Sequence, residues 1–264
     1  MQIIRDADAL KREIDALRAD GATIAFVPTM GALHDGHMAL VAEAKLRADQ
    51  VVASIFVNPT QFAPTEDLSV YPRREAADAA LLDAAGVAIL WAPDVETMYP
   101  DGPEATLKAG SAAEGLDGAS RPGHFDGVAT VVARLFDQVR PDFAIFGEKD
   151  YQQLAVIRQL VQGLKLPIEI VGIPTQRDAD GLALSSRNGH LSADERERAL
   201  GLSRSLAFAV RDPDPVAAAR SSLNGLEPEY VEVLDLGDAK LLAAAIRIGS
   251  TRLIDNVLLE GELT

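Results

Sequence analysis

Five short apolar runs alternate with longer Ala- and Leu-rich segments through the first two-thirds of the chain, and this alternation limits the possible folds more than any other feature. The runs are rich in β-branched residues, while the segments between them place apolar residues at helical spacing. Strands separated by helices imply a parallel sheet covered on both faces. The sequence therefore predicts a doubly wound α/β domain, whose ligands bind outside the carboxyl ends of the strands. The expected strands are Thr23–Val27, Val51–Val57, Val87–Trp91, Phe143–Phe146 and Glu169–Ile173, and the expected helices are His37–Ala48, Arg73–Ala85, Val128–Val139 and Tyr151–Leu164.

The last third of the chain has a different pattern, which begins near Arg177. Helical spacing covers Ser192–Val210 and Pro215–Leu223, and apolar runs of strand length follow at Tyr230–Leu234 and Leu253–Leu259. Helices followed by strands indicate an α+β arrangement. We therefore expect two domains: residues 1–175 form the parallel-sheet domain, and residues 176–264 form a smaller C-terminal α+β domain.

One stretch, Pro93–Gly127, interrupts the alternation and carries four of the chain's 14 prolines together with many glycines. Long irregular segments of compact domains are commonly lids or binding loops. The sequence predicts an irregular excursion here and leaves both a moving lid and a fixed loop open.

The charge and the apolar pattern exclude several classes of protein. A formal net charge of −15 argues against a nucleic-acid partner, since phosphate backbones require a basic face. The chain has no cysteine, which excludes disulfides and thiolate metal sites. Its first residues do not have the pattern of a signal peptide, and no apolar run reaches the roughly 18 residues of a membrane span. We therefore expect a cytoplasmic enzyme that does not enter membranes.

The segment Pro28–His37 follows the first expected strand and opens the first expected helix. Its two glycines let the backbone approach a phosphate, and the helix N-terminus behind them attracts negative charge. His34 and His37 add two donors that become positive when they are protonated. These features indicate a nucleotide-binding site. The alternative is a glycine turn followed by an ordinary helix cap, with both histidines on the surface.

Polar segments also follow the second and fourth expected strands. After the second, Gln61 carries a neutral amide that can donate to a carboxylate and accept from a hydroxyl. The alternative is a simple strand exit at the Asn-Pro turn, with Gln61 in solvent. After the fourth, Gly147 permits a tight turn and Lys149 is a mobile cation suited to phosphate oxygens. The alternative there is a charged helix start capped by Asp150.

The segment Asp180–Asn188 lies just beyond the fifth expected strand. Ser185, Ser186 and Arg187 supply two hydroxyls and a guanidinium, a set that suits a triphosphate because guanidinium donors match phosphate oxygens in pairs. The alternative is a Ser-rich linker capped by Asn188.

These segments, in this order, resemble one enzyme family. His34-Asp35-Gly36-His37 resembles the HxGH signature of the nucleotidyltransferase superfamily, which includes the class I aminoacyl-tRNA synthetases. The longer string PTMGALHDGHMAL is similar to the form found in pantothenate synthetases, the pantoate–β-alanine ligases. The strings FVNPTQF, RPGHF, GEKDYQQ and LSSRN also resemble segments of that family, and TRLIDN near the C-terminus looks familial as well. The resemblance implies a Rossmann-like first domain of the nucleotidyltransferase type.

The resemblance also implies an ATP site, a substrate site and a set of catalytic residues. The implied ATP contacts are Met30, Gly31, Ala32, Leu33, His34, Asp35, Gly36, His37, Gly147, Glu148, Lys149, Asp150, Leu184, Ser185, Ser186 and Arg187, with Gln176 added through its backbone. The implied substrate contacts are Asn58, Gln61, Gln153 and His124, and the catalytic set is His34, His37, Lys149 and Arg187. Some relatives carry an acidic pair near the magnesium ion, whereas this chain has Ala77 before Asp78. We therefore expect no protein ligand for the metal, and Mg²⁺ held mainly through ATP phosphates and water.

The reaction that the resemblance implies joins pantoate to β-alanine through a pantoyl adenylate, with release of pyrophosphate and then AMP. It also implies a homodimer, and a C-terminal domain that covers the active site. Two alternatives share the HxGH segment. One is a nucleotidyltransferase that adenylates a phosphate acceptor, such as a phosphopantetheine adenylyltransferase, and it would not release AMP. The other is a non-catalytic adenylate sensor, which would bind ATP but release no pyrophosphate.

Overall fold

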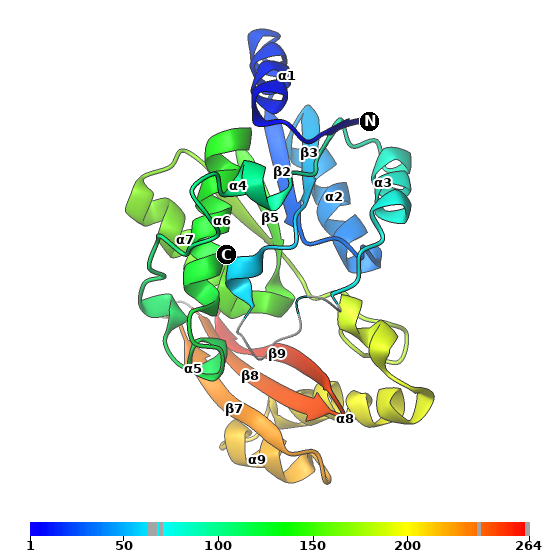
Figure 1. Cartoon of the computed structure of the whole chain (residues 1–264). Helices are drawn as coiled ribbons and strands as arrows, with labels where there is room; N and C mark the ends of the chain where they lie inside the picture. Colours follow the sequence, from blue (N-terminus) through cyan, green and yellow to red (C-terminus); the bar gives the residue numbers. More distant parts are fainter. Residues whose placement is uncertain (63–67, 69–70, 237–238, 262–264) are drawn as a thin grey trace. The chain divides into compact units, whose positions relative to one another are not determined.

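The chain forms two compact units in the computed structural model, which describes residues 1–62, 68, 71–236 and 239–261 (Figure 1). The first unit contains Met1–Gly147 and Gln152–Ile173, and the second contains Glu148–Tyr151 and Pro174–Thr264. Residues 148–151 follow a strand of the first unit in the chain, yet they group with the C-terminal part.

A six-stranded parallel sheet forms the centre of the first unit, in the order β1-β4-β3-β2-β5-β6. From β2 the chain adds β3 and β4 on one side, then crosses to add β5 and β6 on the other. This double winding confirms the predicted fold class. Ligands of such sheets bind at the carboxyl ends, where the winding reverses, which here is between β2 and β5. The strands are β1 (Gln2–Ile4), β2 (Ile24–Thr29), β3 (Gln50–Ile55), β4 (Ile89–Trp91), β5 (Phe143–Gly147) and β6 (Glu169–Ile173).

Helices cover both faces of this sheet, as predicted. Successive residues of a strand point in opposite directions. Ala25 and Val27 of β2 belong to a buried cluster that includes the apolar side of α2 (Asp35–Arg47). Phe26 points the other way, and its ring meets that of Phe136 in α6 (His124–Val139) edge-on, with centroids 6.4 Å apart. The remaining long helices of this unit are α1 (Ala7–Ala19), α3 (Glu75–Ala84) and α7 (Tyr151–Leu164).

The excursion between Pro93 and Gly127 is more regular than predicted. It contains the short helices α4 (Val95–Met98) and α5 (Leu116–Ser120) and the 3₁₀ turn η3 (Ser111–Ala113). Its middle part is fastened to α7 by the Gln152 side chain, which accepts from Asp117 N at 3.0 Å and donates to Ala112 O and Glu114 O at 3.1 Å. A buried amide that bonds four backbone groups, since it also donates to Gly115 O at 3.3 Å, holds this segment in place.

The second unit packs two helices against a three-stranded antiparallel sheet of order β7-β8-β9. Ser192 begins α8 (Ala193–Ala209) with a reciprocal cap to Glu195, and Asp214 caps α9 (Pro215–Ser222). Both helices were predicted. The sheet is larger than predicted, because β8 (Ala239–Ile248) lies between β7 (Pro228–Asp235) and β9 (Thr251–Gly261).

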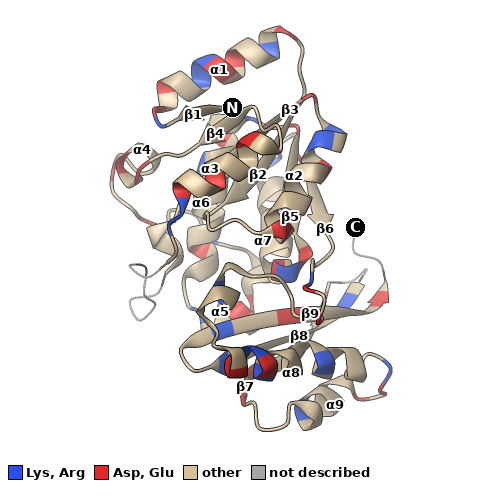
Figure 2. Ribbon diagram, turned by 90° about the vertical axis from the view of Figure 1, so that its right-hand side faces the viewer, with Lys and Arg blue, Asp and Glu red and all other residues tan. Residues whose placement is uncertain are grey.

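Acidic and basic residues are interspersed along the surface helices, as Figure 2 shows for α1 and α8. Many of these cations are paired, for example Lys11 with Asp15 and Arg204 with Glu197. The positive charge on these helices is therefore locally compensated and forms no uniform basic face. Across the described ranges, no helix has the length and apolar character needed to cross a membrane.

Candidate active site

The turn between β2 and α2 is held in a left-handed conformation at two successive residues. Gly31 has φ +84° and Ala32 has φ +51°. A Cβ at position 31 would lie 3.1 Å from both Asp78 Oδ2 and Ile55 Cγ2, so this position suits only glycine. A left-handed Ala is disfavoured by about 1–2 kcal/mol, which means that contacts from outside the turn must hold it.

Asp78 of α3 supplies those contacts. Its carboxylate is 2% exposed and accepts hydrogen bonds from Ala32 N at 2.8 Å and from Leu33 N at 2.9 Å. A buried carboxylate needs such donors, since an unpaired charge in the interior is very costly. These two backbone N–H groups are therefore engaged within the protein. A nucleotide contact at Ala32 or Leu33 would use other atoms.

The two histidines of the turn cap α2 reciprocally. Gly36 N donates to His34 Nδ1 at 3.1 Å, and His34 N donates to His37 Nδ1 at 3.3 Å. A neutral imidazole that accepts at Nδ1 carries its proton on Nε2. Both rings are half-buried, with centroids 4.1 Å apart, and each carries an Nε2–H donor. The cap and the donor function expected from the sequence are thus compatible, because they use different ring nitrogens.

The other residues expected in this ATP segment lie beside the histidines. Met30 and Gly36 are half-buried, and Asp35 is the exposed first residue of α2. An acidic residue in the first helical turn is the usual partner of the helix dipole.

After β3, a buried amide orients Gln61. Asn58 is 1% exposed, and its Nδ2 donates to Gln61 Oε1 at 2.8 Å and to Gly127 O at 3.2 Å. Its Oδ1 accepts from the Tyr99 hydroxyl at 2.7 Å, and burial raises the pKa of Tyr99. Because Asn58 donates to Gln61 Oε1, Gln61 must present its Nε2 as a donor on the other side. Asn58 itself, expected as a substrate contact, has both amide hydrogens in use.

His124 holds the backbone of the same segment. Arginine only donates, so Arg121 Nη1 donates to His124 Nε2 at 2.9 Å, and His124 Nδ1–H donates to Gln61 O at 2.8 Å. Gly127 allows the approach of α6, because a Cβ there would lie 2.2 Å from Thr60 O. His124 thus lies beside Gln61 and contacts its carbonyl.

The segment after β5 contributes to both units. Gln153 lies in the first turn of α7 and is half-buried. Its side-chain amide makes no hydrogen bond with any residue that the structure describes. Gly147 ends β5, while Glu148, Lys149 and Asp150 form the 3₁₀ turn η4 (Glu148–Asp150) of the second unit. The Lys149 side chain is 16% exposed, and its Nζ lies 3.8 Å from Asp150 Oδ1.

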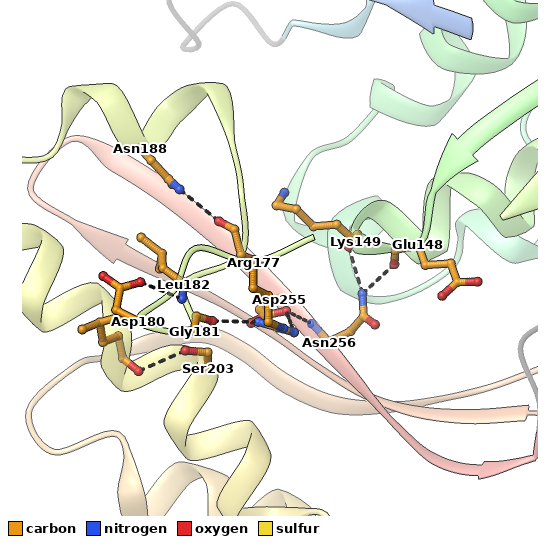
Figure 3. Close-up of polar contacts among 12 residues, drawn as sticks. Glu148, Lys149, Arg177, Asp180, Gly181, Leu182, Asn188, Ser203, Asp255 and Asn256 are labelled. Carbon is orange, nitrogen blue, oxygen red and sulfur yellow. Dashed lines mark hydrogen bonds and ion pairs between the residues drawn. The ribbon is translucent and has the colours of Figure 1, made fainter. Parts of the chain in front are cut away.

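In the second unit, residues 176–184 form a small hairpin that leads into the LSSRN segment (Figure 3). Leu184 N donates to Gln176 O at 2.9 Å, so the Gln176 carbonyl is used within the hairpin, and the Gln176 side chain is exposed. Ser185 then caps the turn η5 (Ser186–His190) by accepting from Arg187 N at 3.3 Å.

Arg187 differs from the other arginines of this hairpin region. Arg177 is paired with Asp255, and Arg196 is paired with Asp178 and Asp180. The half-buried Arg187 guanidinium, by contrast, has no ion-pair or hydrogen-bond partner among the described residues. A half-buried guanidinium without a carboxylate is suited to an anionic ligand.

The acidic groups offer little for direct metal binding. Within the described part of the chain, no three His, Asp or Glu side chains are grouped as metal ligands would be. Asp78 already accepts from two backbone N–H groups.

The sequence did not show what several supporting residues do. Asp78, Tyr99 and Asn256 act through tertiary contacts with the segments above. The sequence drew attention to Asp78 and to the TRLIDN string that contains Asn256, but not to the backbone groups that these side chains bind.

Comparison with known proteins places this geometry in one family. Residues 2–258 match the family model described as pantoate-beta-alanine ligase. Pantothenate synthetase from Rhizorhabdus wittichii is 56% identical, with 98% of this chain and 99% of the relative covered. The enzyme of the same name from Novosphingobium aromaticivorans is 53% identical, with 97% and 98% covered.

Solved structures agree with this assignment. Pantothenate synthetase from Thermus thermophilus has a TM-score of 0.91 at 42% identity and covers 98% of this chain. Pantoate-beta-alanine ligase from Francisella tularensis, complexed with beta-gamma ATP and beta-alanine, has a TM-score of 0.86 at 37% identity and covers 99%. In both cases 99% of the solved chain is matched.

The role of Asp78 predicts the effect of an isosteric change. Asp78→Asn replaces one acceptor oxygen by an NH₂ group that faces a backbone N–H, so one buried donor loses its partner. The expected loss in unfolding free energy is about 1–3 kcal/mol, measured by urea denaturation. Asp83→Asn on the same helix, where the side chain is 63% exposed, is the matched control and should change stability by less than about 0.5 kcal/mol. Equal effects of the two substitutions would contradict the role given to Asp78.

Proposed function

We propose that this chain, which belongs to the pantoate–β-alanine ligase family, activates pantoate by adenylation before it joins the acid to β-alanine. The ligase activity follows from the family, and the residue roles below are our proposal. In the first step, a carboxylate oxygen of pantoate attacks the α-phosphorus of ATP. The bond between that phosphorus and the oxygen bridging to the β-phosphate breaks, and pyrophosphate leaves.

In the second step, the neutral amine of β-alanine attacks the carbonyl carbon of the pantoyl adenylate. The bond from that carbon to the phosphate oxygen breaks, AMP leaves, and the new amide nitrogen loses a proton. We assign no side chain as the base for this step. We therefore propose that the protein acts mainly by positioning the reactants and by stabilising charge.

The reciprocal cap of His34 and His37 is the observation that carries the proposal. Negative charge grows on the phosphate oxygens as pyrophosphate departs, and preorganised donors stabilise that charge most effectively. The two Nε2–H groups are held by the cap at the N-terminus of α2, where the helix dipole also favours anions. We propose that both rings donate to ATP phosphates and that His37 acts on the departing group.

Lys149 and Arg187 are proposed as the cations of the triphosphate site, together with the hydroxyls of Ser185 and Ser186. Two anions must meet in a molecule whose formal net charge is −15, so uncompensated cations are needed locally. Lys149 has only a 3.8 Å contact with Asp150, and Arg187 has no acidic partner among the described residues. Magnesium is proposed to enter with ATP, bound mainly through phosphate oxygens and water, and to neutralise part of the triphosphate charge.

Gln61 is proposed to bind the pantoate carboxylate through its Nε2 donor, with Gln153 as a second pantoate contact. The support is the fixed direction of the Gln61 side-chain amide, which Asn58 holds, while His124 holds the backbone carbonyl of the same residue. We propose that Asn58 and His124 help the substrate indirectly, by orienting Gln61. A homodimer and a cytoplasmic location are also proposed, from the family resemblance.

An assay of the two half-reactions tests the proposed function. The protein is incubated with ATP, magnesium and pantoate, and pyrophosphate is measured before and after the addition of β-alanine. We expect pyrophosphate only when pantoate is present, and pantothenate with AMP only after β-alanine is added. A folded, ATP-binding sample that releases no pyrophosphate with pantoate would reject the proposal.

His37→Ala is expected to lower the rate of pantoate-dependent pyrophosphate release by about 10²–10³-fold, the usual effect of losing one transition-state donor. His37→Gln should keep part of the activity, because an amide Nε2–H can replace the imidazole donor. Single-turnover pyrophosphate release measures both variants, and circular dichroism checks that they fold. Near-normal adenylation by His37→Ala would remove His37 from the mechanism.

Gln61→Glu changes only the donor that faces the proposed acid pocket. Glutamate can still accept from Asn58 Nδ2, but it presents an oxygen where Gln61 presents Nε2–H. The KM for pantoate should rise about 10–100-fold, as expected when a hydrogen bond to a charged group is lost. The Kd of ATP, measured by calorimetry, should stay nearly constant. Gln162→Glu, an exposed change on α7 with the same charge effect, is the control, and an equal rise in its KM would contradict the role of Gln61.

A further inference from the structure

Two adjacent polar residues of β9, Asp255 and Asn256, are both buried, with 3% and 9% of their surface exposed. Adjacent strand residues point to opposite faces, so the pair reaches in two directions from one place on the strand. Leu253, two positions before Asp255, packs in the apolar cluster of the second unit. A buried carboxylate beside an apolar cluster is costly unless its hydrogen bonds are satisfied. The hydrogen-bond partners of Asp255 and Asn256 therefore show which segments these two residues hold.

Asp255 holds the hairpin that precedes the LSSRN segment (Figure 3). Arg177 Nη1 donates to Asp255 Oδ2 at 2.7 Å and Nη2 donates to Oδ1 at 2.9 Å, which is the two-bond geometry of a strong guanidinium–carboxylate pair. The hydrogen bond and the charge of Asp255 raise the pKa of Arg177. Arg177 Nη1 also donates to Gly181 O at 3.2 Å, so the pair closes the hairpin that ends at Leu184.

Asn256 holds the segment that carries Lys149 (Figure 3). Its Nδ2 donates to Glu148 O and to Lys149 O, both at 2.9 Å. Carbonyl oxygens only accept, so the side-chain amide must direct both of its hydrogens toward them. Two bonds to consecutive carbonyls determine the orientation of the peptide between them, and with it the direction in which the Lys149 side chain leaves the backbone. Asn256 and residues 148–151 belong to the same unit.

We infer that Asp255 and Asn256 are a positioning pair, which sets the distance between Lys149 and the Ser185–Arg187 segment and so shapes the triphosphate part of the ATP site. The inference rests on the proposed function, in which Lys149 and Arg187 contact phosphates. The two segments are attached to neighbouring residues of one strand, so their spacing is determined by a single peptide unit. Neither side chain of the pair touches ATP in this account.

The position of these two segments matters because the proposed chemistry depends on where the cations Lys149 and Arg187 lie. A displacement of about 1 Å of a positioning group can cost about 10²-fold in rate, even when the change lies away from the reacting atoms. Without Asn256 Nδ2, the Glu148 and Lys149 carbonyls lose their common donor and the Lys149 backbone is free to rotate. Asn256→Asp is more severe, because an oxygen then faces two carbonyl oxygens.

Asn256→Ala tests the inference against a general loss of stability. The kcat of pantoate-dependent pyrophosphate release should fall about 10–100-fold, while the KM for β-alanine changes by less than about twofold. Leu253→Val is the control, because it also weakens the packing of β9 but removes no hydrogen bond to either segment. It should lower the thermal midpoint while leaving kcat at 25 °C nearly unchanged. Equal losses of kcat in the two variants, at equal folded fractions, would overturn the inference.

A double-mutant cycle shows whether Asn256 acts through Lys149. In a Lys149→Ala background, Asn256→Ala should lower the rate of pyrophosphate release by less than about threefold, because the cation that it positions is already gone. If instead the two losses multiply, Asn256 does not act through Lys149 and the inference fails. Asn256→Asp should behave like Asn256→Ala or worse, and normal kcat in this folded variant would also overturn the inference.

ATP binding separates failure of this inference from failure of the proposed function. If the wild-type protein releases no pyrophosphate with pantoate, the proposed function fails, but calorimetry with magnesium and ATP still tests the pair. Asn256→Ala should then raise the Kd of ATP by about 5–150-fold, the usual range of a coupling between linked sites. An unchanged Kd in that variant would overturn the positioning role independently of the reaction.

Discussion

The hydrogen bonds from Ala32 and Leu33 to the Asp78 carboxylate hold the turn on which the proposed chemistry depends. They keep two successive residues left-handed directly after β2. That turn sets the point at which α2 begins, and the first residues of α2 carry the reciprocal histidine cap. The direction of both Nε2–H donors therefore depends on a carboxylate from another helix. A buried charge that satisfies its donors in this way costs far less than an isolated one, and it restricts the turn to one conformation.

Elsewhere in the chain, neutral side chains hold segments in place through hydrogen bonds, as the charged Asp78 does for the turn after β2. Asn58 and His124 orient Gln61, Gln152 fastens the excursion to α7, and Asn256 holds the backbone at Lys149. Amide and neutral imidazole donors position these segments without adding charge near the ligands. In a molecule with a formal net charge of −15, Lys149 and Arg187 are cations that no carboxylate in the described part of the chain neutralises closely. The proposed triphosphate site depends on that difference.

The sequence was sufficient to predict the doubly wound sheet, because its longer strands are continuous apolar runs between helices. It did not predict β1, which has three residues, or β8, whose Ala- and Leu-rich sequence favours a helix in isolation. The position of β8 between two other strands, where it pairs with both, overrides that preference. The chain's first helix, α1, was also missed, since only Leu10 and Ile14 are buried along it.

The candidate site also has parts that the sequence predicts and parts that it does not. Segments with local signatures, such as the turn at Gly31 and the LSSRN string, were located from the sequence because turn residues and strand ends are visible there. Supporting contacts were not, since they join residues that are far apart in the chain. Asp78 lies 46 residues from Ala32, and Asn256 lies 107 residues from Lys149. Such pairs follow only from the tertiary fold, which brings them together.

The central claim is that pantoate is activated by attack of its carboxylate on the α-phosphorus of ATP. Measuring whether a carboxylate oxygen is transferred to AMP tests this claim most directly. The protein is supplied with ATP, magnesium, β-alanine and pantoate whose carboxylate carries ¹⁸O, and the products are analysed by mass spectrometry. We expect one ¹⁸O atom in AMP and none in pyrophosphate, because the attacking oxygen stays on phosphorus when the amine displaces AMP. Unlabelled AMP, or label in inorganic phosphate, would show that the carboxylate does not attack the α-phosphorus.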